Sequence, residues 1–302
     1  MISLRARLLR LLLRAYTYPA RRAHRSLSRS ARPRSGKYRP PAGFSLREER
    51  FGGVRVEVLL PPAREGAPLL HFHGGGHTQP MNDMYRRIAE RYARLTGGAV
   101  YSIDYEAGEE KRYPSVHDEC FAAYRALAAR IDISRAAAAG DSFGAGLLLH
   151  CCLRARAEGL ALPRAAVCVS PFVDLSASGD SYRENCHRDP LYALPRGQAF
   201  ETFEHCVRRG TPYCGQTNPR DALLSPAFAS YEGFPPALIQ CGSLETSASD
   251  ADMLAARMRE AGVPVRRTRY AGMWHDFQYL TPSLPESRRA WREIAAFLRE
   301  VQ

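Results

Sequence analysis

The chain has 302 residues, of which 45% are hydrophobic and 25% are charged, and its formal net charge is +12. This length and composition suit one catalytic domain with a substantial core. The eight cysteines form no C-x-x-C pair and lack the dense spacing of a disulfide scaffold, so reduced thiols and a cytoplasmic location are expected.

Most of the positive charge lies in the first 50 residues, which we expect to form a basic leader. They contain 14 Arg and Lys against only Glu48 and Glu49, whereas the rest of the chain balances at 29 basic and 29 acidic residues. Arg10 and Arg14 interrupt the leucine run, so no secretory signal is predicted, and no segment is long enough to span a bilayer. Without a DNA-reading motif or interleaved stacking aromatics, no nucleic-acid partner is expected.

The first 20 residues have the pattern of an amphipathic helix. Five apolar residues share one helical face, namely Leu4, Leu8, Leu11, Leu12 and Ala15. Arg7, Arg10 and Arg14 share another face, as in helices that lie at membrane interfaces. Two interpretations stay open: residues 1–20 contact an anionic membrane, or they form a cap helix whose leucine face packs on the body of the protein.

Strand-like runs alternate with helical stretches through residues 51–302 and predict a single α/β catalytic domain. A mainly parallel central sheet with helices on both faces is expected. The runs are Val54–Leu60, Leu69–His73, Ala99–Tyr105, Ala136–Gly140, Ala165–Ser170, Ala237–Cys241 and Val263–Tyr270. A final amphipathic helix is expected from about Glu286.

The segment from about 176 to 231 breaks the alternation and predicts a helical cap inserted into this domain. It is rich in Arg, Asp, Pro and aromatic residues. Its aromatic side chains either line a substrate pocket or pack the cap helices on the sheet. The candidates are Tyr182, Tyr192, Phe200 and Phe203.

A glycine loop follows the expected strand that ends at His73. Backbone N–H groups in such a side-chain-free loop can point at the oxyanion of an acyl-transfer transition state. The expected donors are the N–H groups of Gly75, Gly76 and Phe143, and Gly74 can replace either glycine. The alternative is an ordinary glycine turn.

Three histidines around this loop also raise a metal-binding alternative, because an H-x-H pair offers two ligands on one strand face. They are His71, His73 and His77. Without an Asp in the motif or a second ligand cluster downstream, we favour a structural role in which His73 braces the glycine loop. No metal and no organic cofactor are therefore predicted.

The segment Gly140-Asp141-Ser142-Phe143-Gly144 matches a G-x-S-x-G nucleophile elbow. In such an elbow the chain turns sharply from strand to helix, and the flanking glycines leave room for the strained backbone. An apolar run before the motif and a largely apolar stretch after it fit this strand-turn-helix context. Ser142 is therefore the predicted nucleophile.

A general base and its orienting carboxylate are expected later in the chain. His275 follows a strand-like run, and an imidazole titrates near neutrality, so it can take the Ser142 proton and return it to the leaving alcohol. Glu245 follows the run Ala237–Cys241 and is the predicted acid of the triad. Asp250 and Asp252 are rivals, but both fall in a predicted helix, where acidic residues near the first turn complement the helix dipole.

These motifs in this order resemble the hormone-sensitive-lipase-like group of bacterial α/β-hydrolase esterases, over roughly residues 55–300. The matching segments are His73–Gly76, Gly140–Gly144, Ser170–Leu175, Ser225–Pro226, Pro235–Ile239, Ala261–Val265 and Met273–His275. The chain departs from the family pattern at Phe143, where alanine is usual and where a ring would narrow the site. It also has Glu245 where many members have aspartate, and it lacks the arginine and proline usual after Asp104-Tyr105.

The resemblance and the motifs together predict a serine carboxylesterase that cleaves short- to medium-chain acyl esters through an acyl-enzyme. The same chemistry also fits a deacylase or acyltransferase of specialised metabolism. A third alternative is a ligand-binding protein that keeps this fold without catalysis. The expected partner is a small-molecule ester.

Overall fold

The computed structural model describes residues 2–22, 38–63, 65–192, 194 and 212–301. Among these residues it contains a sheet of eight strands in the order β1-β2-β4-β3-β5-β6-β7-β8. The strands are β1 (Ser45–Phe51), β2 (Val54–Leu60), β3 (Ala67–Phe72), β4 (Gly97–Asp104), β5 (Ala137–Asp141), β6 (Ala165–Val169), β7 (Ala237–Gly242) and β8 (Val265–Tyr270). Pairing is antiparallel from β1 through β2 to β4 and parallel from β4 to β8.

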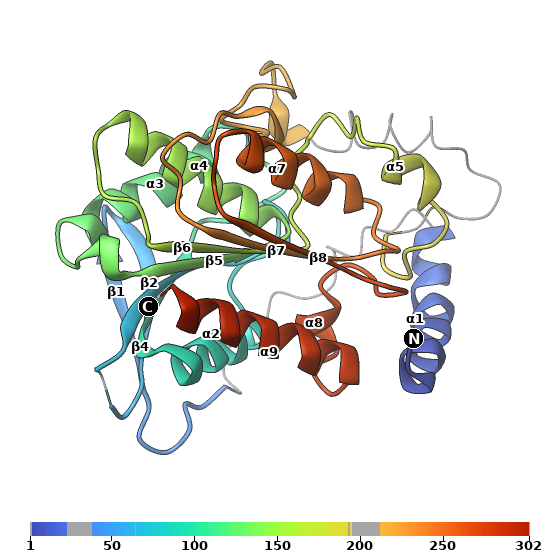
Figure 1. Cartoon of the computed structure of the whole chain (residues 1–302), viewed down its shortest axis with the longest axis horizontal. Helices are drawn as coiled ribbons and strands as arrows, with labels where there is room; N and C mark the ends of the chain where they lie inside the picture. Colours follow the sequence, from blue (N-terminus) through green and yellow to red (C-terminus); the bar gives the residue numbers. More distant parts are fainter. Residues whose placement is uncertain (1, 23–37, 64, 193, 195–211, 302) are drawn as a thin grey trace.

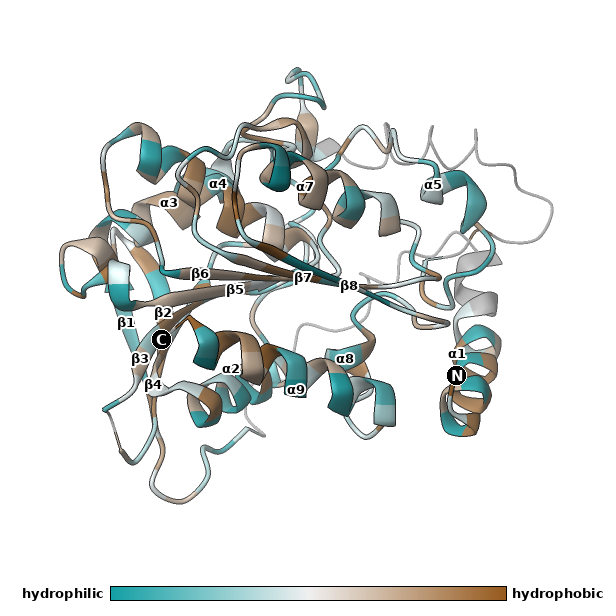
Figure 2. Cartoon of the chain, in the orientation of Figure 1, coloured by the Kyte–Doolittle hydropathy of each residue, from teal (hydrophilic) through white to brown (hydrophobic). Residues whose placement is uncertain are grey.

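Helices cover both faces of this sheet (Figure 1). One face carries α3 (Ser115–Ala128), α4 (Phe143–Ala157) and α7 (Ala248–Glu260), and the other carries α2 (Asp83–Thr96), α8 (Phe277–Leu280) and α9 (Pro285–Glu300). The strands β5, β6 and β7 are buried along their whole length, and β7 in particular is hydrophobic in Figure 2. A doubly covered parallel sheet of this kind requires such apolar strands. The predicted fold class is therefore confirmed.

The sheet begins at Ser45, inside the segment expected to be a leader. The strand β1 pairs with β2 over its full length and lies at the edge of the sheet. Its sequence, Ser-Leu-Arg-Glu-Glu-Arg-Phe, exposes four consecutive charged residues. Charges on an edge strand discourage pairing with another chain. They also hide the strand from an analysis that looks for alternating apolar residues.

Helix α1 (Leu4–Arg22) packs at the β8 end of the sheet (Figure 1). Its inner face contributes Ala6, which is 1% exposed, and the partly buried Leu9 and Leu13 to a cluster around Trp274, and Ile2 joins this cluster from just before the helix. The helix begins after Ser3, whose hydroxyl accepts the N–H of Ala6. The helix therefore docks on the body, but not through the leucine face that the sequence suggested for docking.

The described part of the predicted cap consists of loops and short helices. They are α5 (Ser181–Glu184), η3 (Pro212–Cys214) and η4 (Pro226–Phe228). Tyr182 is buried and donates its hydroxyl to Asp250 at 3.2 Å, so it packs this segment on α7. Tyr192 is half exposed and lies against His275. Phe200 and Phe203 lie outside the described residues.

Candidate active site

Ser142 stands at the sharp turn between β5 and α4. Its backbone has φ 51° and ψ −124°, a conformation that L-residues rarely adopt. The turn is held by Ser142 N–H donating to the Val169 carbonyl at 2.9 Å and by Phe172 N–H donating to the Ser142 carbonyl at 3.1 Å. A side chain at Gly144 would collide with the Phe72 carbonyl, so this position requires glycine. The strained serine is thus presented at the carboxyl end of β5, where ligands bind in sheets of this type.

The glycine loop after β3 lies beside this turn and is held by two side chains. The Tyr105 hydroxyl lies 3.2 Å from the His73 and Gly74 carbonyls and 2.9 Å from the Gly76 carbonyl. His73 stacks on the Tyr105 ring at 4.2 Å, and its Nδ1 lies 2.9 Å from the Gly74 carbonyl, to which it donates. These contacts fit the predicted bracing role of His73.

Two glycines of the loop keep their N–H groups free of backbone partners within the described residues. Gly75 has φ +88° and Gly76 φ +64°, which turns these peptide groups away from regular structure. The N–H of Phe143, in the first turn of α4, is likewise unused by the helix. The Gly74 N–H instead donates to Asp141 Oδ1 at 3.1 Å. This geometry favours Gly75 and Gly76 over Gly74 as the expected oxyanion donors.

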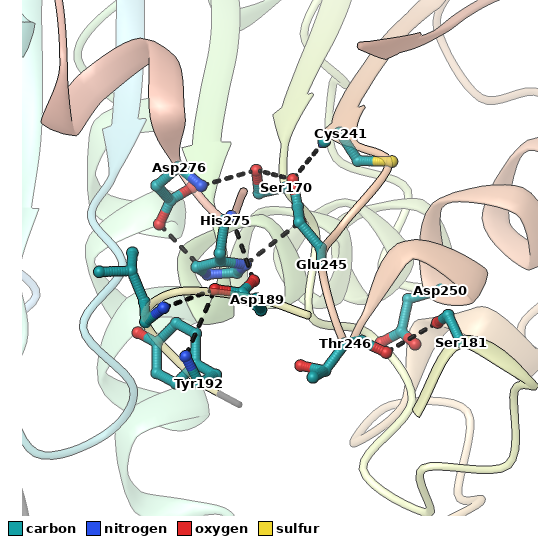
Figure 3. A network of polar contacts seen from close by, with 12 residues as sticks. Ser170, Ser181, Asp189, Tyr192, Cys241, Glu245, Thr246, Asp250, His275 and Asp276 are labelled. Carbon is teal, nitrogen blue, oxygen red and sulfur yellow. Dashed lines mark hydrogen bonds and ion pairs between the residues drawn. The ribbon is translucent and has the colours of Figure 1, made fainter. Parts of the chain in front are cut away.

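His275 lies on the loop that follows β8, and its imidazole faces Glu245 (Figure 3). The imidazole Nδ1 lies 3.2 Å from Glu245 Oε2. The other carboxylate oxygen of Glu245 accepts a hydrogen bond from the Ser170 hydroxyl at 2.8 Å and another from the Gly242 N–H. Glu245 is fully buried, so these three contacts satisfy a charge that water does not reach.

Two further carboxylates surround the same imidazole. Asp276 Oδ2 lies 3.2 Å from His275 Nε2, and Asp189 Oδ2 accepts the His275 backbone N–H at 3.3 Å. Burial lowers the pKa of His275, but the carboxylates of Asp276, Glu245 and Asp189 outweigh it and raise that pKa to about 10. Burial raises the pKa of Asp276 to about 7 and that of Asp189 to about 6.

The rival acids lie elsewhere. Asp250 Oδ2 accepts the N–H groups of Val173 and Asp174 at 2.9 and 3.0 Å and the Tyr182 hydroxyl, and it joins the segment after β6 to α7. Asp252 is on the surface and pairs with Arg267 at 2.7 Å. Geometry therefore brings Glu245, and neither of these aspartates, to His275.

An aromatic cluster lies beside the nucleophile. The Phe143 ring is 4% exposed and meets Tyr213, His117 and His77 edge-on, with ring centroids 5.4, 5.7 and 6.3 Å away. His77 stacks on Tyr213 at 4.8 Å, and His117 Nδ1 is 2.7 Å from the Tyr213 hydroxyl. The side chain that departs from the family pattern is thus locked into a packed wall next to Ser142.

The three histidines of the metal alternative make separate contacts. His71 Nδ1 lies 3.0 Å from the Ser102 hydroxyl, His73 stacks on Tyr105, and His77 stacks on Tyr213. Within the described residues, no group of three or more His, Cys, Asp and Glu side chains has an arrangement that could hold a metal ion.

A cavity of about 650 Å³ borders the cap segment between residues 175–183 and 214–220, and neither Ser142 nor His275 lines it.

Sequence reasoning singled out Ser142, Glu245 and His275, but it did not name four residues that hold the glycine loop or contact Glu245 and His275. They are Tyr105, Ser170, Asp189 and Asp276. Ser170 and Tyr105 carried a signal in the motifs, Ser170 as the first residue of the matching segment Ser170–Leu175 and Tyr105 in the pair Asp104-Tyr105. The site combines a serine at a strand-to-helix turn, free N–H groups beside it and an imidazole that faces a carboxylate. These are the groups that acyl transfer requires.

Known proteins similar to this chain are hydrolases, which agrees with the chemistry of these groups. Residues 69–279 match a family described as the α/β hydrolase fold. An acetyl-hydrolase from Streptomyces hygroscopicus is 34% identical over 249 residues, which are 82% of this chain and 80% of the relative. The crystal structure of an esterase from the bacterial hormone-sensitive lipase family is 30% identical, with a TM-score of 0.81 over 99% of both chains. A hormone-sensitive lipase from a metagenome library is 28% identical, with a TM-score of 0.84 over 98% of this chain and 99% of the other. The chain therefore belongs to the α/β hydrolase family and, within it, to the hormone-sensitive-lipase-like group of carboxylic ester hydrolases.

Proposed function

We propose that this enzyme is a serine carboxylesterase that hydrolyses short- to medium-chain acyl esters through a Ser142-His275-Glu245 triad. The observations that carry the proposal are the strained Ser142 at its strand-to-helix turn, the glycine loop with N–H groups free of backbone partners, and the imidazole paired with Glu245. These groups supply the nucleophile, the oxyanion donors and the base that ester hydrolysis needs, without metal or organic cofactor.

In this mechanism the Ser142 hydroxyl gives its proton to His275 Nε2 while Oγ bonds to the carbonyl carbon of the ester. The N–H groups of Gly75, Gly76 and Phe143 hold the resulting oxyanion. Collapse of the tetrahedral intermediate breaks the ester C–O bond, and the alcohol leaves with the proton from His275. Water then attacks the acyl-enzyme with His275 as base, which releases the carboxylic acid and returns the proton to Ser142.

The restriction to short and medium acyl chains rests on Phe143. Its ring lies in the first turn of α4, one residue from the nucleophile, and the stacked pair His77 and Tyr213 holds it in place. A ring at this position takes up volume that a small side chain would leave for acyl carbons. Each methylene that a pocket accepts or refuses is worth about 10-fold or more in kcat/KM.

We also propose that the enzyme sits peripherally on an anionic membrane through α1. The leucine face of this helix points away from the body: Leu4, Leu8, Leu11 and Leu12 are 54–71% exposed, and Tyr16 is 81% exposed. The helix contains no acidic residue. Its arginines flank the leucines and complement the charge of an anionic lipid surface. No described helix is long and apolar enough to cross a bilayer, so this contact would be interfacial, on the cytoplasmic side.

Two other functions use the same residues. A deacylase or acyltransferase would form the same Ser142 acyl-enzyme and differ in the acyl donor or in the group that accepts the acyl chain. A non-catalytic ligand-binding protein would form no acyl-enzyme. The intact pairing of His275 with Glu245 favours a catalytic function over binding alone.

The test is hydrolysis of p-nitrophenyl esters from acetate to palmitate by the wild type, Ser142→Ala and Phe143→Ala. We expect activity that peaks at short or medium chains and is lost in Ser142→Ala. Phe143→Ala should raise kcat/KM for octanoate relative to acetate by about 10-fold, because the ring no longer limits the acyl chain.

The three results separate the proposals. Hydrolysis that survives in Ser142→Ala would refute the triad, and an unchanged chain-length profile in Phe143→Ala would refute the role of the ring. A folded wild type that hydrolyses none of the esters would favour a deacylase of narrow specificity or a binding function.

A further inference from the structure

Both ring nitrogens of His275 face carboxylates (Figure 3). Nδ1 lies 3.2 Å from Glu245 and Nε2 lies 3.2 Å from Asp276. Because Glu245 occupies Nδ1, Nε2 is the atom that must accept the Ser142 proton. In the described part of the chain, however, no hydrogen bond joins Ser142 to His275. The base is thus engaged by a carboxylate at the position where the nucleophile has to bind.

The backbone holds Asp276 in this position. The residue has φ +52° and ψ 28°, the left-handed region that few side chains other than Asn and Asp tolerate. Its N–H donates to the Ser170 hydroxyl at 3.0 Å, and the same hydroxyl donates to Glu245 at 2.8 Å. Ser170 therefore ties the backbone of Asp276 to the triad carboxylate, so a movement of the carboxylate away from His275 has to be a rotation of the Asp276 side chain.

We propose that Asp276 is a positioning residue that keeps His275 in a resting state by occupying Nε2, and that catalysis begins when Ser142 replaces it there. The proposal rests on the proposed function of Ser142 and His275. The exchange moves no covalent bond. The exchange requires a rotation of the Asp276 side chain. A bound ester favours this rotation, because it excludes water beside Ser142 and leaves less room for the Asp276 carboxylate at Nε2.

The charges around the imidazole explain why the contact matters for rate. Asp189 approaches from the segment after α5 and Asp141 from the end of β5, and the Tyr192 ring lies edge-on at 5.0 Å. Tyr85 on α2 reaches the same group of carboxylates with its hydroxyl 3.4 Å from Asp141. With Asp276 in contact, the carboxylates of Asp276, Glu245 and Asp189 keep His275 protonated near neutral pH. A protonated imidazole cannot act as a base, so the resting contact lowers the active fraction of the enzyme.

The test is the pH dependence of kcat/KM for a short-chain ester in the wild type and in Asp276→Asn. Asparagine has the same shape and tolerates the left-handed backbone, but it removes the charge from Nε2. An opposite charge within about 4–6 Å typically shifts a pKa by about 1–3 units. We therefore expect the acidic limb to move to lower pH by about 1 unit or more, with kcat/KM at pH 7 rising about 10-fold.

Asp252→Asn is the matched control, since it removes one carboxylate from the surface of α7, where Asp252 pairs with Arg267. Its acidic limb should coincide with that of the wild type. If the Asp276→Asn limb stays where it is or moves to higher pH, the resting-state role is wrong. A lower kcat at every pH with an unmoved limb would assign Asp276 a purely structural role.

A measurement without substrate keeps this outcome apart from failure of the proposed function. Imidazole ¹⁵N NMR titration of His275 should give a lower pKa in Asp276→Asn than in the wild type, whether or not esters are hydrolysed. Equal pKa values in the two proteins would overturn the inference. Absence of ester hydrolysis with a lowered His275 pKa would instead count against the proposed function alone.

Discussion

Glu245 is fully buried and satisfied by the Ser170 hydroxyl, the Gly242 N–H and the His275 imidazole. Asp250 is equally buried, but its partners are the backbone N–H groups of Val173 and Asp174. The Glu245 carboxylate is placed to orient the His275 imidazole, whereas the Asp250 carboxylate holds the loop that follows β6. The two residues lie five positions apart in the sequence, and the folded geometry agrees with the choice of Glu245 at the strand end over Asp250 in the helix.

This difference gives the first prediction. Glu245→Gln should lower kcat by about 10³- to 10⁴-fold with little change in KM, because the imidazole loses the partner that fixes its tautomer. Asp250→Asn should lower the melting temperature and leave kcat of the folded enzyme within about 10-fold, because it replaces an acceptor of buried hydrogen bonds that does not contact His275. Steady-state kinetics and thermal unfolding of both variants check this. A larger loss of kcat in folded Asp250→Asn would contradict the assignment.

For single residues, the sequence predicted the candidate site residues that lie in motifs. It did not predict the contacts that folding makes between residues far apart in the chain. Ser142 and His275 stand in recognisable patterns. Asp189, by contrast, lies 86 residues before His275 and reaches it only because the loop after α5 returns to the site. Asp276 follows His275 directly, yet its contact with Nε2 depends on a left-handed backbone that residue periodicity does not report.

Among the elements, all seven predicted strands formed with ends close to those expected. Most of them are largely apolar runs, whereas β8 carries three arginines. The strand β1 was not predicted. Its four charged residues are compatible with a strand only at a sheet edge, where the neighbour β2 supplies the hydrogen bonds and solvent takes the side chains. The edge position is a property of the whole sheet and is not visible in the local sequence.

The helix α1 shows a related limit. Its sequence identifies a leucine face and an arginine face, but the residues that dock on the body are Ile2, Ala6, Leu9 and Leu13. Both this set and the outward leucines are apolar, so the pattern alone cannot say which one packs. Ile2 packs closely against Gly272, and Thr17 donates to the Pro190 carbonyl at 2.6 Å. These contacts with the body fix the orientation of the helix.

The exposed leucine face leads to the second prediction. Leu8→Ser combined with Leu12→Ser should lower binding to vesicles of phosphatidylglycerol and phosphatidylcholine by about 10-fold or more, because each buried leucine contributes about 1.5–3 kcal/mol. Vesicle sedimentation measures this. Leu223 and Leu280 are also exposed, at 38% and 42%, and their double substitution to serine is the control. Weak binding by the wild type, or a concentration-dependent dimer that the first pair of substitutions disrupts, would reject the membrane in favour of a second copy of the chain.

In the molecule as a whole, buried histidines couple stability to pH. Burial lowers the pKa of His150 to about 4 and that of His71 to about 3, so both are neutral in the folded protein. In the unfolded chain a histidine takes up its proton near pH 6.5. Between these values the unfolded state binds more protons, so the stabilisation is complete above pH 6.5 and is lost as the pH falls towards 4.

The third prediction follows for His150, which donates Nδ1–H to the Leu223 carbonyl at 2.8 Å. Lowering the pH from about 6.5 to 4 should cost the wild type about 3 kcal/mol of unfolding free energy through this residue. His150→Gln keeps a donor for Leu223 and does not titrate, so its stability should fall less steeply over the same range. Urea unfolding at several pH values measures both slopes. Parallel slopes would show that His150 does not carry the effect.

The central claim is that Ser142 forms a covalent acyl-enzyme, and labelling with a fluorophosphonate followed by peptide mass spectrometry tests it most directly. We predict one adduct per chain, located on the peptide that contains Ser142 and absent from Ser142→Ala. An adduct on another residue, or a folded wild type that forms none, would contradict the proposed mechanism.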